Sequence, residues 1–600
     1  MSSTLDLVPR EQSARGTGSN AEPSWTAPAP GYTTAGQALA RASQPGYFDW
    51  LDHVRAAAGC TRPIRLSGGI NTYDRAGTLL DSRHTDQLPD GAIYKACGNR
   101  RATVCPACAR IYQRDAYQLL RTGLVGGKGV PASVSRHPAA FVTLTAPSFG
   151  TVHTRHIRRH TCTDRKRCDC RPDPCHARRD TPGPCVHGTP AVCWTRHPAD
   201  DPDLGQPLCL DCYDHDHHVV FNLHAAELWH RTKQHAERAL AKLCRARGIP
   251  PVLVSSANGK TRKVAPVRLS HGKAAEMQRR GAIHFHALVR LDGISPDDPA
   301  AVVPPPPGIE LADLVDALEA AAGQVTFTTP AHPEHPDGWP MSWGEQVDIR
   351  SISLSGSGEV TDGMVAGYLA KYATKSTEAT GHTSTRITDD NVGLFAHPRG
   401  SHVERLINAC WRLGRDPASS TNERGGLRAY RGLVGSAGGP FVEPWDCPHC
   451  GTHTRYRACP VCVAERQASL DTKPASTTTP ASSYTKLRRW AHMLGYGGHF
   501  LTKARRYSVT FRLLRDTRIT FRRTEDPPHT DLGTVRAADH LDETTLIVGT
   551  LTFAGVGWHN NGDALLANTA AAMARARHET GREELAHELG RTLATILIAA

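Results

Sequence analysis

The chain has 600 residues, a formal net charge of +13 and 18 cysteines. This length exceeds what one hydrophobic core organises, so we expect about three to five modules. No apolar run reaches the roughly 18 residues of a membrane span, and the N-terminus lacks the pattern of a secretory signal, which favours a cytoplasmic protein with no membrane partner. The excess of Lys and Arg favours a polyanionic partner, most simply nucleic acid.

The N-terminal part of the chain combines a tail with a first candidate zinc site. Residues 1–45 are rich in Ser, Thr, Ala, Gly and Pro and are expected to form a disordered tail. Residues 46–135 are expected to form a zinc module with a helix over 109–122. Thiols stay reduced in the cytosol, so clustered cysteines indicate metal more than disulfides, and four thiolates suit a tetrahedral zinc ion. The candidate ligands are Cys60, Cys97, Cys105 and Cys108.

Residues 136–380 are expected to form the main core, interrupted by an insert. The core opens with an alternating, β-branched stretch at 140–147 that proline stops, which predicts a buried strand. Residues 153–218 are dense in Cys, His, Arg and Pro. The candidate ligands in the insert are Cys162, Cys168, Cys170, Cys175, His176, Cys185, His187, Cys193, Cys209 and Cys212. They leave room for one or two zinc ions, although spacing does not assign their grouping, and the insert is expected to fold only with metal. The insert would serve either as a lobe that contacts phosphate or as a purely structural module.

The stretch 276–291 carries two histidines separated by one residue. In a strand, His284 and His286 point to one face and the intervening apolar residues to the other. Two imidazoles so placed can bind one cation. Nearby Glu276 adds a carboxylate of the kind that Mg²⁺ or Mn²⁺ prefers. The alternative is a structural histidine pair in the core of a sheet.

A helix predicted over 361–375 holds two overlapping Tyr-x-x-Lys units. At about 100° per residue, Tyr368, Tyr372, Lys371 and Lys375 share one face. A phenol becomes a nucleophile only if its phenolate is stabilised, which lysine ammonium groups or a metal with its bound phosphate can do. The alternative is an amphipathic helix with core tyrosines and solvated lysines. Apolar patterns also predict helices over 219–247 and 310–322 and a strand over 346–352.

The C-terminal third is expected to begin with a helix and a zinc knuckle in residues 400–466. Two Cys-x-x-Cys pairs supply the knuckle ligands Cys447, Cys450, Cys459 and Cys462. Residues 467–483 are expected to form a flexible linker. Residues 484–524 mix cations with aromatics, as in phosphate contact with base stacking, although a basic segment packed on its own domain fits equally well. Residues 525–600 predict an α/β region without identifiable chemistry.

Three blocks in this order resemble the HUH endonuclease superfamily. A strand ending in Thr-Leu-Thr-x-Pro comes first, His-Phe-His at 284–286 second, and Tyr-x-x-Lys-Tyr-x-x-Lys at 368–375 third. Three longer blocks are most similar to replication initiators of actinomycete plasmids and integrative elements. They are Cys-x-Asn-Arg-Arg…Cys-Pro-x-Cys, Arg-Arg-Gly-Ala-Ile-His-Phe-His-Ala-Leu-Val-Arg-Leu-Asp-Gly and Trp-Ala-His-Met-Leu-Gly…His-Phe-Leu-Thr-Lys-Ala-Arg-Arg-Tyr. The resemblance covers roughly residues 55–520 and leaves out the insert at 153–218.

The resemblance implies an α+β fold with an antiparallel HUH sheet flanked by helices, several small zinc modules and a helical, basic C-terminal region. It implies a site-specific nickase that starts rolling-circle replication through a 5′-phosphotyrosine, leaving a 3′-hydroxyl for a polymerase. The catalytic residues would be Tyr368, Tyr372, Lys371 and Lys375, and the ligands of Mg²⁺ or Mn²⁺ would be His284, His286 and Glu276. Zinc would be structural.

Two other classes of protein remain compatible with the sequence. A two-tyrosine transposase or a relaxase would use the same chemistry on other DNA ends. A non-catalytic, multi-zinc DNA-binding regulator would use the histidines and tyrosines only for structure. Single-stranded origin DNA is the expected partner of the nickase. Because no Gly-x-x-x-x-Gly-Lys-Ser/Thr phosphate loop is present, a host helicase is expected to unwind the DNA.

Overall fold

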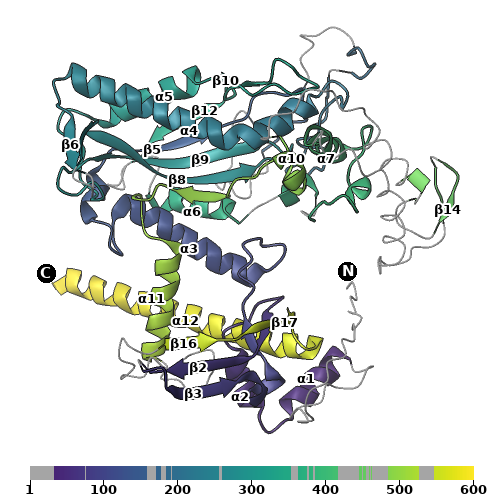
Figure 1. Ribbon diagram of the computed structural model, residues 1–600, viewed down its shortest axis with the longest axis vertical. Coiled ribbons are helices and arrows are strands. Elements are labelled where there is room, and N and C mark those ends of the chain that lie inside the picture. The colour runs from purple at the N-terminus through teal and green to yellow at the C-terminus, as the bar shows by residue number, and fades with distance from the viewer. Residues whose placement is uncertain are drawn as a thin grey trace. The chain divides into compact units, whose positions relative to one another are not determined.

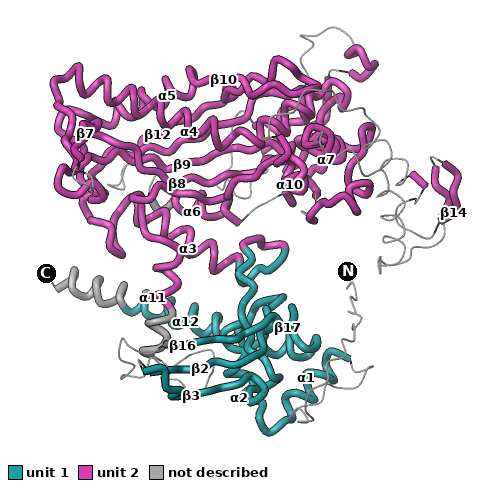
Figure 2. Tube along the Cα trace, viewed as in Figure 1, with its two compact units in different colours: residues 1–99, 104–108, 519–600 teal, residues 100–103, 109–518 magenta. Residues whose placement is uncertain are grey.

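The computed structural model describes residues 33–74, 76–157, 170–176, 184–190, 192–255, 260–352, 362–374, 377–382, 385–415, 445–448, 450–454, 459, 461–462, 484–525 and 546–599. The chain divides into two compact units (Figure 2). The central unit comprises residues 100–103 and 109–518, and the terminal unit combines residues 1–99, 104–108 and 519–600. Segments from both ends of the chain therefore build one unit.

The central unit is organised around a five-stranded antiparallel sheet with the order β12-β5-β9-β8-β15 (Figure 1). Its strands are β5 (Ala139–Leu144), β8 (Val267–Met277), β9 (Ile283–Gly293), β12 (Val347–Ser351) and β15 (Leu501–Lys503). The strands predicted at 140–147 and 346–352 are confirmed as β5 and β12. The stretch 276–291 contains the end of β8, a tight turn and most of β9, which holds the central position.

Helices cover both faces of this sheet, and alternate side chains of β9 pack against different helices. The covering helices are α3 (Pro106–Val125), α4 (His215–Ala246), α5 (Leu311–Gln324) and α6 (Asp362–Tyr372). Phe285 joins a core with α4 and α5, whereas Leu288 joins a core with α6 and the part of α3 that follows residue 108. Burial on both faces explains why all of β9 except His284 is fully buried.

Figure 1 shows α4 and α5 on one side of the sheet and α6 on the other. The helices predicted over 219–247, 310–322 and 361–375 are confirmed as α4, α5 and α6. The mixed helix and antiparallel-sheet content confirms the α+β class.

The other described elements of the central unit are short, apart from α7 and α11. They are β6 (Val252–Ser255), β7 (Thr261–Val264), β10 (Phe327–Thr328), β11 (Pro340–Met341), α7 (His402–Leu413), β13 (Trp445–Asp446), β14 (His453–Thr454), α10 (Lys486–Arg489) and α11 (Phe511–Glu525), the last of which runs on into the terminal unit. Ser401 and Glu404 form a capping box that starts α7. In the part of the chain that the structure describes, no helix has the length and apolar character needed to cross a membrane.

The terminal unit has two three-stranded sheets, each completed by a strand from the C-terminal end of the chain. The sheet orders are β17-β1-β4 and β16-β2-β3. The strands are β1 (Ile64–Ser67), β2 (Gly69–Tyr73), β3 (Leu79–His84), β4 (Ile93–Lys95), β16 (Leu546–Gly549) and β17 (Thr552–Val556), and the helices are α1 (Thr34–Ala42), α2 (Tyr47–Val54) and α12 (Asn561–Ala599). The α/β region at 525–600 is thus part of the N-terminal fold.

The prediction of a disordered tail over residues 1–45 is wrong for the C-terminal part of this range. Residues 34–42 form α1, which Thr33 caps by accepting a hydrogen bond from the Gly36 amide. Arg41 is only 4% exposed and pairs with Asp563 and Asp90 at 2.9 and 2.8 Å. A partner 522 residues away orders this helix, which local composition cannot show. Residues 1–32 lie outside the described ranges.

Three aromatics of the segment 484–524, for which base stacking was one expectation, are too buried to stack on bases. Tyr496, Phe500 and Tyr507 are at most 5% exposed. Tyr507 donates a hydrogen bond to the Leu120 carbonyl of α3, and β15 adds an edge to the main sheet. These aromatics therefore belong to the core. The linker expected at 467–483 lies outside the described ranges.

Candidate active site and metal centres

Two histidines of β9 lie side by side on the face of the sheet that α6 covers. Their ring centroids are 4.4 Å apart. The Thr143 hydroxyl of β5 lies 3.2 Å from His286 Nδ1, and the Gln278 amide lies 3.0 Å from His284 Nδ1. His284 Nε2 is buried and has no hydrogen-bond partner among the described residues. Because an unpartnered buried polar atom is costly, this nitrogen is suited to binding a further group.

Glu276 of β8 supplies a carboxylate to this pair. It lies directly across the sheet from His284, and its Oε2 is 3.2 Å from His286 Nε2. Burial, together with the nearby His286 and Arg280, lowers the pKa of His284 to about 3, so its ring is neutral at physiological pH. Neutral imidazoles with a carboxylate suit a divalent cation. The donor atoms of His284, His286 and Glu276 are more widely spaced than those of the cysteine clusters described below, in which all ligand atoms lie within 4.8 Å of one another.

Both tyrosines of α6 pack against the same histidine. The ring centroids of Tyr368 and Tyr372 are 4.6 Å apart, and each lies 5.1 Å from the His286 ring. Tyr372 stacks on the imidazole, while Tyr368 meets it edge-on and also meets Phe141 of β5. The structure therefore brings the predicted tyrosines and histidines together at one place on the sheet.

The surroundings of the tyrosines favour neutral phenols. Burial raises the pKa of Tyr368 and that of Tyr372, and the Glu276 carboxylate acts in the same direction. A phenolate here therefore needs added positive charge. Tyr368 is 43% exposed and thus accessible to a large substrate. Lys371 is exposed on the same helix, while Lys375 lies outside the described residues.

The C-terminal end of α6 is held by an arginine from the Cys-x-Asn-Arg-Arg block. Arg100 donates a hydrogen bond to the Ala373 carbonyl at 3.1 Å, and its guanidinium lies 4.0 Å from the centre of the Phe500 ring. A cation at a helix C-terminus also interacts favourably with the helix dipole. Arg100 thus fixes the end of the helix beside Tyr372, a role that the sequence did not suggest.

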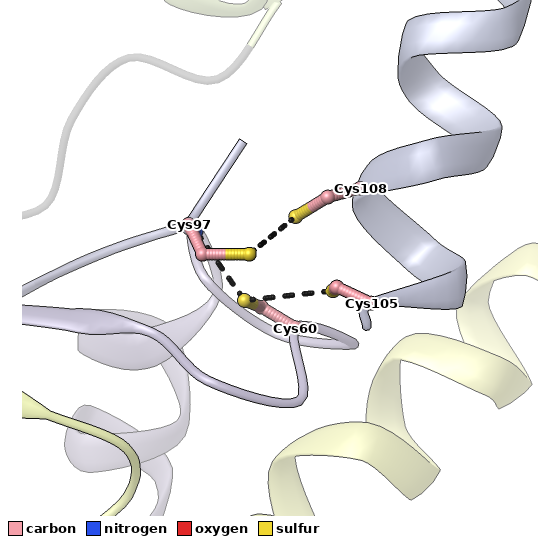
Figure 3. Close-up of side chains that lie close together, drawn as sticks. All are labelled: Cys60, Cys97, Cys105 and Cys108. Carbon is pink, nitrogen blue, oxygen red and sulfur yellow. Dashed lines mark hydrogen bonds between the residues drawn. The ribbon is translucent and has the colours of Figure 1, made fainter. Parts of the chain in front are cut away.

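Four cysteines of the terminal unit meet in the arrangement that the sequence predicts (Figure 3). Cys97 Sγ lies 3.7 Å from Cys108 Sγ, and Cys105 Sγ lies 3.8 Å from Cys60 Sγ. Tetrahedral zinc with Zn–S bonds near 2.3 Å would separate sulfur atoms by about 3.8 Å. The Cys97 amide also donates to Cys60 Sγ at 3.3 Å. Sulfur spacing and amide donation both suit a closed zinc-thiolate site.

The knuckle cysteines form a second cluster of the same kind. Cys447 Sγ lies 3.6 Å from Cys462 Sγ, and Cys450 Sγ lies 3.4 Å from Cys459 Sγ. All four sulfur atoms lie within 4.8 Å of one another. This cluster also fits a structural zinc ion.

The insert contains two more clusters, which include ligands that the sequence analysis missed. The clusters are His153, Cys175, Cys193 and His197, and Cys185, His187, Cys209 and Cys212. His153 and His197 were not among the candidates, since isolated histidines carry no ligand spacing of their own. Of the other candidates, Cys170 and His176 belong to neither cluster, and Cys162 and Cys168 lie outside the described residues.

Comparisons with known proteins agree on one family. The family model described as "Replication initiator protein, pSAM2" matches residues 46–439 and 447–572. A protein from Streptomyces ambofaciens named "Replication initiator protein" is 34% identical over 565 residues, covering 93% of this chain and 97% of the relative. No solved structure gives a significant match.

Proposed function

The chain belongs to the pSAM2 family of replication initiator proteins, and on this premise we propose that it is an HUH-type nickase and strand transferase. It would cut one strand at a specific origin of a plasmid or integrative element and so start rolling-circle replication. The observation that carries this proposal is the packing of Tyr368 and Tyr372 against His286, beside Glu276. Family membership favours an initiator over a transposase or a relaxase.

The sheet supports an HUH assignment because the histidines occupy its central strand and the tyrosine helix covers the same face. His284, His286 and Glu276 would hold a divalent cation, Mg²⁺ or Mn²⁺. Their donor set and the unpartnered His284 Nε2 fit such an ion. The ion would supply positive charge that polarises the scissile phosphate and lowers the pKa of a nearby phenol.

The proposed reaction is a transesterification in which one tyrosine replaces a deoxyribose oxygen. The phenol of Tyr368 or Tyr372 gives up its proton to solvent, its oxygen attacks the phosphorus, and the bond from phosphorus to the 3′-oxygen breaks. The leaving 3′-oxygen takes up a proton from solvent. The products are a 5′-phosphotyrosine and a 3′-hydroxyl that a host polymerase extends. The phosphodiester energy is retained, so the second tyrosine can carry out the strand transfer that ends a round. Lys371 and Lys375 would stabilise the developing negative charge.

A covalent-adduct assay tests the proposal. Full-length protein with Mn²⁺ and single-stranded origin DNA is expected to give a denaturant-resistant adduct, which Tyr368→Phe/Tyr372→Phe abolishes. His284→Ala/His286→Ala is expected to abolish the adduct as well. Tyr112→Phe, at a partly buried tyrosine of α3 that stacks on Phe511, is the matched control and should keep it.

Two results would contradict the proposal. An adduct that survives the double tyrosine substitution would show that the nucleophile lies elsewhere. Absence of an adduct with wild-type protein on every origin-derived strand would favour the non-catalytic DNA-binding regulator.

A further inference from the structure

The insert between β5 and α4 holds two sets of metal-ligating side chains that alternate along the chain. The first set is His153, Cys175, Cys193 and His197, and the second is Cys185, His187, Cys209 and Cys212. In chain order, two ligands of the first set precede two of the second, and the same order then repeats. Each ion would join two segments that are separated by ligands of the other ion. The two halves of the insert would therefore brace one another.

Distances within the first set match tetrahedral zinc. With Zn–S near 2.3 Å and Zn–N near 2.0 Å, ligand atoms are separated by about 3.3 Å for N···N and about 3.5 Å for S···N. His153 Nδ1 lies 3.2 Å from His197 Nε2 and 3.8 Å from Cys175 Sγ. Cys193 Sγ lies 3.6 Å from His197 Nε2. The four side chains are thus positioned as two nitrogen and two sulfur ligands of one ion.

Distances within the second set lead to the same conclusion. His187 Nδ1 lies 3.2 Å from Cys212 Sγ and 3.8 Å from Cys209 Sγ. With Cys185, these residues offer three sulfur ligands and one nitrogen ligand within 4.8 Å of one another. Both sets use soft ligands typical of structural zinc.

His197 links the first set to the stretch that follows it. Its Nδ1 lies 2.8 Å from the Asp201 carboxylate, so its Nε2 can bind metal. A carboxylate on the far nitrogen of a ligating histidine fixes the orientation of the ring and strengthens it as a ligand. The His197 side chain is only 2% exposed, so this orientation is held by packing as well.

The stretch after His197 is hydrogen-bonded to the turn between β8 and β9. Arg279 in that turn donates to the carbonyls of Asp201 and Ala199 at 2.8 and 2.7 Å. A Cβ added at Gly205 would lie 2.8 Å from the Arg279 Cβ, so the two backbones are in close contact. The stretch that follows the last ligand of the first set therefore contacts this turn directly.

The same turn is also bonded to the segment that leads from β5 into the insert. Arg280 donates to the carbonyls of Ala146 and Pro147 at 3.1 and 3.2 Å. Its Nε donates to Gln278 Oε1, and the amide of Gln278 contacts His284. Arg279 thus connects the interior of the insert to the hairpin that carries the candidate active site, and Arg280 connects the segment that precedes the insert to the same hairpin.

We propose that the insert is a cross-braced module that binds two zinc ions, and that the first ion positions the turn between β8 and β9. This role goes beyond the nickase chemistry proposed above and does not depend on it. The described residues would hold four zinc ions, one for each cysteine-containing cluster.

Paired substitutions in the full-length protein test the grouping by zinc content. Cys175→Ser/Cys193→Ser removes two ligands of one site and is expected to lose one zinc per chain. Cys175→Ser/Cys185→Ser removes a ligand from each site and is expected to lose two. If each ion instead used four consecutive ligands, the two variants would exchange these results, which would overturn the alternating arrangement.

A second measurement on the wild-type protein avoids the risk that a variant fails to fold. Zinc is removed stepwise with a chelator, released thiols are alkylated, and the labelled cysteines are mapped by mass spectrometry. Cys175 is expected to become reactive together with Cys193, at a different step from Cys185, Cys209 and Cys212. Reactivity of Cys175 in step with Cys185 instead of Cys193 would contradict the proposal.

Hydrogen exchange tests the link to the hairpin. Loss of the first zinc in Cys175→Ser/Cys193→Ser is expected to speed amide exchange in residues 278–284 by about tenfold or more. Arg279→Ala keeps every zinc ligand but removes the connection, so it should speed exchange there while retaining the zinc content of the wild type. Unchanged exchange in residues 278–284 after loss of the first zinc would show that the ion does not position the turn.

Discussion

Glu276 contacts His286 of the candidate active site at 3.2 Å and is the cross-strand neighbour of His284. Glu276→Gln keeps the size of the side chain and removes its charge. We expect the Kd for Mn²⁺ to rise about 10- to 100-fold, the range seen when a ligand or its supporting carboxylate is lost. Electron paramagnetic resonance titration measures free Mn²⁺ directly.

Glu227→Gln is the matched control for the Mn²⁺ titration. Glu227 lies on α4, half exposed, and pairs with Arg231. Its substitution should leave the Kd unchanged. Equal affinity of the Glu276→Gln variant and the wild type would remove Glu276 from the metal site.

Asp292, near the end of β9, stabilises the central sheet. It accepts hydrogen bonds from Arg290 and Ser270 and contacts His137, all of them buried. Burial alone would raise the pKa of Asp292, but the bonds from His137 and Arg290 lower it below the ordinary value. We expect Asp292→Asn to destabilise the protein by about 3 kcal/mol at pH 7, because it leaves the Arg290 charge buried without its counterion.

The pH dependence of this effect follows from the direction of the shift. A carboxyl whose pKa is lower in the folded state contributes stability above its unfolded pKa, and this contribution is lost as pH falls through the folded pKa. The difference in the free energy of unfolding between Asp292→Asn and wild type should therefore shrink below about pH 4. Urea unfolding at several pH values measures it. Asp348→Asn, in an exposed pair with Arg350, is the control and should change the free energy of unfolding by less than about 0.5 kcal/mol. A change equally small for Asp292→Asn would show that Asp292 does not stabilise the sheet.

Local pattern was enough to place the main residues of the candidate site. Alternation along a strand placed His284 and His286 on one face, and helical spacing placed the two tyrosines together. It could not find Thr143, Gln278, His153 or His197, because each acquires its role from a partner distant in the sequence or across a turn.

Two helical glycines are expected to respond to alanine substitution in opposite directions. A Cβ at Gly123 of α3 would overlap the ring of Tyr507, which is completely buried and cannot move aside. Gly123→Ala should therefore destabilise the central unit by about 1–3 kcal/mol. Gly367 of α6 has no atom within 4 Å of an added Cβ. Gly367→Ala should stabilise the protein by roughly 0.5–1 kcal/mol by restricting the unfolded chain.

Denaturant unfolding of both variants provides the comparison, with each glycine serving as the control for the other. Destabilisation of equal size at the two positions would mean that loss of a helical glycine matters in itself and that contact with Tyr507 does not. The periodicity and composition of the sequence predict whether a segment forms a helix or a strand. They do not predict which side chain packs against a given glycine, because that depends on tertiary packing.

The sequence did not reveal that the two ends of the chain form one unit. The strands β16 and β17 pair with β2 and β1, and Asp563 accepts hydrogen bonds from Arg41. These partners are separated by roughly 480 to 520 residues along the chain. No local pattern encodes such pairing, so composition led to a disordered tail at one end and a region without identifiable chemistry at the other.

Joining the ends has a consequence for the zinc site of the terminal unit. Trp558, just after β17, donates a hydrogen bond to the Cys60 carbonyl at 2.9 Å, and α12 packs beside Gly59 through Ala571. A chain that stops at residue 525 would lack β16, β17 and α12. We expect it to lose about one zinc ion per chain and to become sensitive to protease in residues 33–99, while the described segments within residues 109–518 stay resistant.

Met573→Gln is the control for this truncation, since Met573 is 58% exposed on α12. It should keep the full zinc content and the protease resistance of the intact chain. Zinc measured per chain, with alkylation of Cys60, Cys97, Cys105 and Cys108, separates loss of this site from loss of the others. A truncated chain that keeps these four thiols protected would show that residues 33–108 fold and bind zinc without the C-terminal segment, so that the ends of the chain associate without depending on each other.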